Sequence, residues 1–287
     1  MNKRWKTFWI VCATVFTLGI VMVGLGATMG GTLSLAGSQD GILNWTSFGP
    51  WPNWITTDVT DRFSSSQDSA DGLKFTDIQN LSVDIGLMTV VMIGWDEDEI
   101  VIDTSDVSRE LLGQLNIGAS GDTLNISMRN VRNWSGLIGN QSSTLRIFMP
   151  KDQVFDRADL FIGAGEIIVE QIEATVLDIS IGAGAGEIKE FSAETVSIHV
   201  GAGRLEMSGA VEEQLEADCG MGEVVLHLDG TEADFGYAID VGMGSVQVGS
   251  LNVSGMGRQA TGNLQTAEAM LNIRAGMGRV EVNFIDR

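Results

Sequence analysis

Residues 177–207 read LDISIGAGAGEIKEFSAETVSIHVGAGRLEM and carry the pattern from which the fold of this chain follows. In this stretch, copies of Gly-x-Gly begin at Gly182 and at Gly201, 19 residues apart. The same step leads back to a copy at Gly163 and on to one at Gly220, and two later copies follow after steps of 22 and 34 residues. The glycines of all these copies are Gly163, Gly165, Gly182, Gly184, Gly201, Gly203, Gly220, Gly222, Gly242, Gly244, Gly276 and Gly278. A fixed period near 20 residues is typical of stacked repeats and untypical of a compact enzyme domain.

Apolar residues alternate with polar ones on both sides of each Gly-x-Gly. Around Gly201 they are Val196, Ile198 and Val200 before it, and Leu205 and Met207 after it. A period of two indicates strands with one buried face, so each repeat is predicted to be a strand, a glycine corner and a second strand. We therefore predict an all-β fold, a β-solenoid built from stacked repeats of about 19 residues.

The corner glycines have a structural interpretation. A chain that turns sharply between stacked strands needs either a positive φ angle or a close approach of two backbones, and glycine tolerates both. A phosphate-binding loop is the alternative, but such a loop occurs once, leads into a helix and usually carries a lysine. These copies recur, lead into strands and lack the lysine, so we interpret them as corners.

Charged residues at equivalent positions would line up if consecutive copies stack in register. Glu187, Arg204 and Glu223 are expected to form a column of alternating charge. Asp218 and Asp240 each lie two residues before a corner on consecutive rungs, which are about 4.8 Å apart, so their carboxylates could be close, although Arg274 and His199 take the neighbouring places. Clustered carboxylates are what a glycan-cleaving enzyme needs, and a solvated charge ladder, which we favour, is the simpler interpretation.

The rest of the sequence offers no pattern for catalysis or metal binding. His199 and His227 differ in their position relative to the corners and are not expected to meet. No HExxH, CxxC or paired-histidine spacing occurs. We expect no catalytic, cofactor-binding or metal-binding residues, no cofactor and no enzyme activity.

The N-terminus has the pattern of a membrane anchor. The segment from Phe8 to Met29 holds 22 residues without a charge, enough to span a bilayer as a helix. Lys3, Arg4 and Lys6 precede it, which places the N-terminus in the cytoplasm and the following chain outside. A cleaved signal peptide is the alternative, but its apolar core is usually shorter, about 7–15 residues. We favour an uncleaved signal anchor and a single-pass cell-membrane protein.

The predicted organisation follows from these segments. Residues 1–7 form a cytoplasmic stub, 8–29 the anchor, 30–80 a stalk and 81–287 the β-repeat domain. Within this domain the regular repeats run from about 144 to 287. An insertion at about 249–269 is expected to form a surface loop with a binding role, and the last strand, 280–284, is expected to cap the stack.

Three tryptophans of the stalk, Trp45, Trp51 and Trp54, lie within ten residues of each other. They could lie at the membrane interface, pack on the base of the domain or contact a partner.

The net charge limits the kinds of partner, and the positions of the cysteines bear on disulfide formation. Beyond the basic stub, 14 Lys and Arg face 38 Asp and Glu, a net charge of −24. Such an acidic surface argues against nucleic acid or anionic lipid as a partner. Of the two cysteines, Cys12 lies in the apolar segment and Cys219 in the predicted core, so no disulfide is expected within the chain.

The order of parts resembles a family of bacterial β-strand-repeat proteins described as candidate adhesins and common in Gram-positive bacteria. The residues that carry the resemblance are LRIFMPKD at 145–152, ADCGMGE at 217–223, GTEADFGY at 230–237 and GMGRVEVNF at 276–284. The resemblance covers about residues 80–287 and implies a membrane anchor followed by stacked repeats. It supplies no catalytic residue.

The function expected from the sequence is a binding or structural role at the cell envelope. The partner would be a cell-wall polymer, a host surface or a membrane protein, and not a nucleic acid. Two alternatives stay open: an accessory protein of envelope-stress signalling that acts through a membrane partner, and a glycan-active enzyme on the face of the solenoid.

Overall fold

The structure is a computed structural model that describes residues 72–128, 143–262 and 267–286. The chain divides into two units, Met1–Phe63 and Ser64–Arg287, and every described residue belongs to the second. The predicted anchor at 8–29 and the tryptophans at 45, 51 and 54 lie outside the described residues. Within the described ranges, no helix has the length and apolar character needed to cross a membrane.

The regular secondary structure of the described residues is almost entirely β-strand, which confirms the all-β prediction. The exceptions are a one-turn helix, α3 (Arg109–Leu112), and a 3-10 turn, η4 (Glu232–Asp234). The strands are β1 (Leu73–Phe75), β2 (Asn80–Ile85), β3 (Thr89–Trp95), β4 (Ile100–Asp103), β5 (Leu115–Ser120), β6 (Thr123–Met128), β7 (Thr144–Pro150), β8 (Val154–Ile162), β9 (Glu166–Val169), β10 (Ile172–Ile181), β11 (Ala185–Val200), β12 (Arg204–Cys219), β13 (Glu223–Asp229), β14 (Phe235–Val241), β15 (Ser245–Val248), β16 (Leu251–Ser254), β17 (Arg258–Gly262), β18 (Ala269–Ala275) and β19 (Arg279–Ile285).

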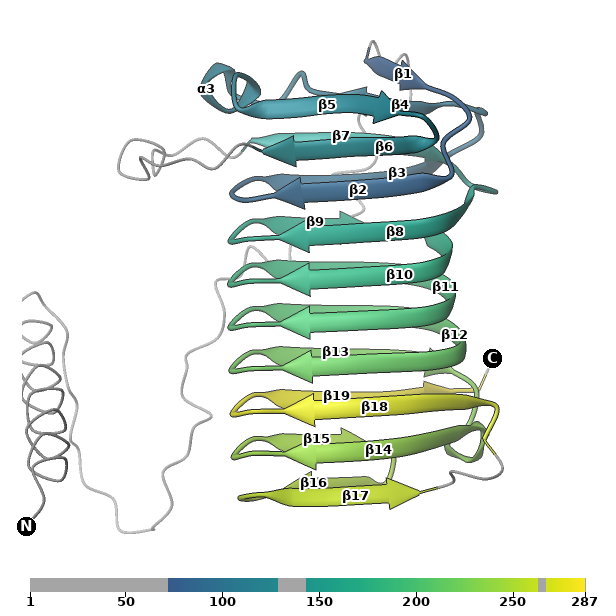
Figure 1. Cartoon of the computed structure of the whole chain (residues 1–287), viewed down its shortest axis with the longest axis vertical. Coiled ribbons are helices and arrows are strands. Elements are labelled where there is room, and N and C mark those ends of the chain that lie inside the picture. The colour runs from purple at the N-terminus through teal and green to yellow at the C-terminus, as the bar shows by residue number, and fades with distance from the viewer. Residues whose placement is uncertain (1–71, 129–142, 263–266, 287) are drawn as a thin grey trace, which may run out of the picture. The chain divides into compact units, whose positions relative to one another are not determined.

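The strands lie on two faces and pair mainly in parallel (Figure 1). The first face runs through β6, β2, β8, β10, the second halves of β11 and β12, β18 and β14. The second face runs through β7, β3, β9, the first halves of β11 and β12, β13, β19 and β15. We call a strand of the first face, its glycine corner and the following strand of the second face a rung.

The core lies between the two faces and repeats from rung to rung. Ile179, Ile198 and Ala217 are register partners on neighbouring strands, each 19 residues after the last, and each is fully buried. The residues between them along the strands point outward, as a period of two requires. A slip of one residue would turn this whole apolar set to solvent, so the pattern itself fixes the register.

The rungs at the C-terminal end do not follow the order of the sequence. Strand β18 pairs with both β12 and β14, and β19 pairs with both β13 and β15. The last rung of the chain therefore lies inside the stack, as the yellow strands between green ones show in Figure 1. The prediction that 280–284 caps the stack is wrong.

The cap is made by the segment that the sequence suggested as a surface loop. Strands β16 and β17 pair antiparallel with β15 and β14. They cover the outer edge of each face, where unpaired backbone groups would otherwise be free to pair with a strand of another chain. The chain then returns to the place left free between two earlier rungs, which explains the step of 34 residues between the last two corners.

The N-terminal end is arranged in a similar way. The rung of β2 and β3 lies between strands β6 and β7 on one side and β8 and β9 on the other. Strands β1, β4 and β5 add antiparallel edges. Because β1 pairs with β4, the folded part includes residues from the predicted stalk and begins before Leu81.

Candidate binding surface

All twelve glycines of the Gly-x-Gly copies lie at corners, where each approaches the backbone of the next rung closely. A Cβ atom on Gly203 would lie 2.2 Å from the carbonyl oxygen of Gly184, and one on Gly201 would lie 2.7 Å from that of Gly182. None of the twelve is among the residues of the described part with positive φ. Close approach, and not an unusual φ angle, is thus the reason for glycine at these positions.

A ladder of charged side chains crosses the first face near the corners. Arg274 lies between Asp218 and Asp240, because the rung that carries it is inserted between theirs. Its Nη1 donates to Asp218 Oδ1 at 3.1 Å and also to Glu216. These hydrogen bonds, first with Glu216 and then with Asp218, raise the pKa of the Arg274 guanidinium.

The prediction that the two aspartates lie on consecutive rungs is therefore wrong. Asp218 has Arg274 on one side and His199, with Nε2 at 3.6 Å from its Oδ2, on the other. Asp240 accepts a hydrogen bond from Gln259 at 3.4 Å on its far side. The arrangement is a ladder of alternating charge in contact with solvent.

A second charged column lies on the opposite face. Glu223 is flanked by Arg204 at 3.7 Å and by Arg279 at 4.0 Å. The alternation of Arg204 and Glu223 is as predicted, but Glu187 is not part of this column. It pairs in register with Glu206, because Ala185 occupies the position next to Arg204.

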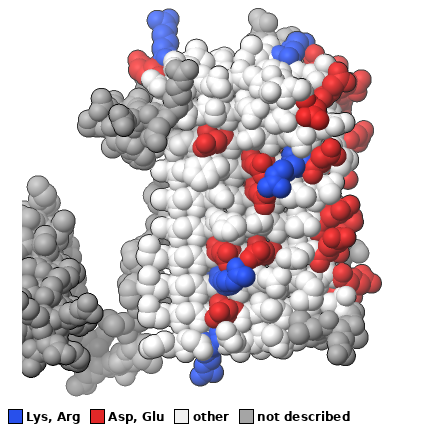
Figure 2. All heavy atoms as spheres, viewed as in Figure 1, with Lys and Arg blue, Asp and Glu red and all other residues white. Residues whose placement is uncertain are grey.

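Most of the visible surface is uncharged, and its charged side chains are mainly acidic. Figure 2 shows Asp and Glu side chains in several clusters with a few Lys and Arg among them. Of the two histidines, His199 lies on the first face and His227 in β13 on the second, 3.8 Å from Glu206. Within the described ranges, no three His, Cys, Asp or Glu side chains are grouped in a way that could hold a metal ion.

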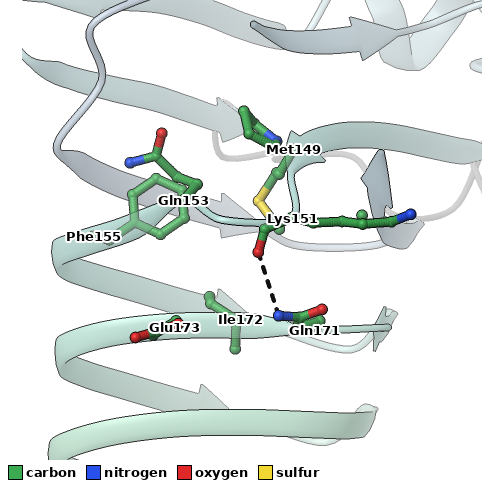
Figure 3. A pocket seen from close by; sticks show the side chains of 9 residues that line it. Met149, Lys151, Gln153, Phe155, Gln171, Ile172 and Glu173 are labelled. Atoms are coloured by element: carbon green, nitrogen blue, oxygen red, sulfur yellow. Dashed lines mark hydrogen bonds between the residues drawn. The ribbon is translucent and has the colours of Figure 1, made fainter. Parts of the chain in front are cut away.

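One small recess lies where β7 ends and β8 begins (Figure 3). Gln171 Nε2 donates to the carbonyl oxygen of Lys151 at 3.3 Å across it, and Phe155 and Met149 form its apolar wall. Its volume of about 10 Å³ is the space of a single water molecule. We interpret it as a packing gap.

A row of exposed methionines was not foreseen from the sequence. Met221, Met277, Met243 and Met256 are 63, 56, 63 and 83% exposed. The first three are the middle residues of successive corners, with Met277 N bonded to Gly220 O at 2.7 Å and Met243 N to Gly276 O at 2.6 Å. Met256 lies in the cap, where Gly257 N bonds to Gly242 O at 2.8 Å. We call these four residues the methionine ridge.

The signal for this ridge was present in the sequence. The middle residue of the corner is alanine at positions 164, 183 and 202 and methionine at 221, 243 and 277. The sequence does not show that these methionines are adjacent. They are adjacent because the rung of Met277 is inserted between those of Met221 and Met243.

Comparisons with known proteins give a general likeness. No family model matches the chain, and no curated protein matches it significantly. Among solved structures, the chain is similar to a candidate cell-adhesion protein from Clostridium sporogenes, at 14% identity and a TM-score of 0.38 over 76% of this chain and 100% of the other. It is also similar to a candidate adhesin from Parabacteroides distasonis, at 13% identity and a TM-score of 0.37 over 75% and 98%.

A third similar structure is a candidate lipid-binding protein from Parabacteroides distasonis, at 14% identity. The match covers 74% of this chain and 96% of the other, with a TM-score of 0.28.

Proposed function

We propose that this chain is a single-pass membrane protein whose repeat domain is an extracytoplasmic β-solenoid with a non-catalytic binding role at the cell envelope, in the manner of an adhesin. The observation that carries the proposal is the alignment of outward side chains in straight columns across the rungs, such as His199, Asp218, Arg274 and Asp240. Such a surface repeats about every 4.8 Å and suits an extended or flat partner.

Charge complementarity suggests what kind of partner would bind. The chain beyond its basic stub carries a net charge of −24, and the first-face column has two carboxylates, Asp218 and Asp240, to one permanent cation, Arg274. A partner with exposed basic groups would be attracted over a distance set by the ionic strength. Cell-wall polymers with free amino groups and basic host-surface or membrane proteins fit this description.

The test is a binding assay of the full chain against such polymers and proteins. The double variant Asp218→Asn with Asp240→Asn removes two charges from the first face, and we expect it to weaken saturable binding about tenfold. Added salt should also weaken binding of the parent protein. The control is Glu110→Gln with Asp122→Asn, which removes two charges in α3 and in the turn before β6. Equal binding by both double variants would contradict the proposal.

The anchor and the topology need a separate test. Protease added to intact cells should remove the repeat domain and leave an N-terminal tag protected. Protection of the domain would contradict the extracytoplasmic location. If the polymer assay is negative and the domain is outside, crosslinking in the membrane with and without Trp45→Ala, Trp51→Ala and Trp54→Ala would test the alternative, a role in signalling through a membrane partner.

A further inference from the structure

The corners that carry the methionine ridge leave the four thioethers unobstructed. Each of Met221, Met277, Met243 and Met256 stands between two glycines, so no other side chain projects from the same corner. The backbone hydrogen bonds from corner to corner, at 2.6–2.8 Å, hold the ridge at the spacing of the sheet. Neighbouring methionine Cα atoms are therefore about 4.8 Å apart.

The ridge makes little contribution to the core. In the described part of the chain, its four residues are the methionines with exposed side chains. Met88, Met92, Met149 and Met207, by contrast, are buried. The rungs with corners at Gly163, Gly182 and Gly201 place alanine at the same position, so the corner itself does not require a long side chain. Four adjacent exposed thioethers call for an explanation other than packing.

We propose that the methionine ridge binds a soft monovalent metal ion, Cu(I) or Ag(I), through thioether sulfurs of adjacent corners. Thioethers are soft ligands and select such ions over hard or borderline ones. Methionine is unbranched, with three rotatable side-chain bonds, so sulfurs on neighbouring rungs can turn toward one ion. The acidic surface attracts a cation, and a thioether needs no deprotonation to bind it.

The chemistry distinguishes this site from an apolar contact surface. A second copy of the chain or another apolar partner would contact leucine about as well as methionine, because the two side chains have similar volume and hydrophobicity. A metal ion would not bind leucine. Met→Leu substitution at the exposed corners therefore separates the two explanations without removing apolar surface.

The experiment is a titration of the full chain with Ag(I), followed through the methyl signals of methionine labelled at the ε-carbon. Because a thiol also binds soft metals, the background is Cys12→Ala with Cys219→Ala. We expect the signals of the four ridge methionines to shift together, with Ca²⁺ and Zn²⁺ unable to displace Ag(I). Binding should also change little between pH 5.5 and 8, about the range in which histidine ligands titrate.

The matched variants complete the test. Replacement of all four ridge methionines by leucine should reduce Ag(I) affinity more than about tenfold, while Met270→Leu, at a half-buried methionine of β18, should leave it unchanged. Circular dichroism confirms that both variants fold. Equal Ag(I) binding by the four-leucine variant, or no shift of the ridge signals, would overturn the proposal.

Discussion

At the scale of the residue, the two glycines of one corner are under unequal constraint. A Cβ on the first glycine would lie 2.6–3.0 Å from a carbonyl oxygen of the neighbouring rung, but one on the second would lie 2.1–2.5 Å away. Both distances are too short for real atoms, and the second demands the larger shift of the backbone. Since the backbone at a corner bonds to the next rung, such a shift also strains the ladder.

We therefore predict that Gly203→Ala destabilises the protein more than Gly201→Ala. Overpacking of this kind costs about 1–3 kcal/mol, with Gly203 at the upper end and Gly201 at the lower. Urea unfolding of the two variants measures the difference at a single corner. An equal or reversed order would mean that backbone approach does not set the requirement for glycine.

The buried thiol of Cys219 gives a dependence on pH. Burial raises the pKa of this group, so the folded state keeps the proton where the unfolded chain, with a pKa of about 8.5, releases it. The contribution of the neutral thiol is present below that pH and is lost as the pH rises toward the folded pKa. The free energy of unfolding should fall more steeply above pH 8.5 in the parent than in Cys219→Ala. Parallel profiles would contradict this.

At the scale of the element, the sequence was sufficient to predict strands and their buried faces. Val196, Ile198 and Val200 are predicted as one apolar face of a strand, and all three are buried in β11. Local alternation determines this because the side-chain period of a strand is two. The same rule misplaced Glu187, since a charge can be assigned to a column only when the exact partner of each residue is known.

An insertion of one residue between Val200 and Gly201 tests the register of the strand. The corner is held by hydrogen bonds to the next rung, so the extra residue would turn Val196, Ile198 and Val200 toward solvent. Exposure of three such side chains costs several kcal/mol, about 1.5–3 for each. The measurement is thermal unfolding, and an unchanged midpoint would show that the register is not fixed in this way.

At the scale of the whole molecule, the order of the rungs could not be predicted from the sequence. Each rung has the same apolar pattern, so the rung with its corner at Gly220 could stack almost equally well on the rung of Gly242 or on that of Gly276. In the observed order, β16 and β17, which precede the last rung in the chain, occupy the outer edges of β15 and β14, and the last rung lies on the inner side of these strands. The methionine ridge depends on that order and was missed for the same reason.

Deletion of residues 267–287 should therefore destabilise the protein far more than deletion of its last two residues. The deleted strands β18 and β19 lie between β12 and β14 and between β13 and β15, so both faces lose their continuity. In a stack of repeats each rung is stabilised by its two neighbours. We expect loss of the cooperative transition in thermal unfolding, while deletion of the last two residues should have little effect. Near-parental stability of the long deletion would contradict the inserted position.

The central claim is that the last rung in the sequence lies between two earlier ones, and disulfide crosslinking tests it most directly. In a Cys12→Ala, Cys219→Ala background, cysteines replace Met221 together with either Met277 or Met243. Neighbouring rungs lie about 4.8 Å apart and alternate rungs about 9.6 Å apart, and only the shorter distance permits a disulfide. We predict rapid crosslinking of positions 221 and 277 and none of 221 and 243. The reverse result would show that the rungs follow the order of the sequence and would contradict the structure described above.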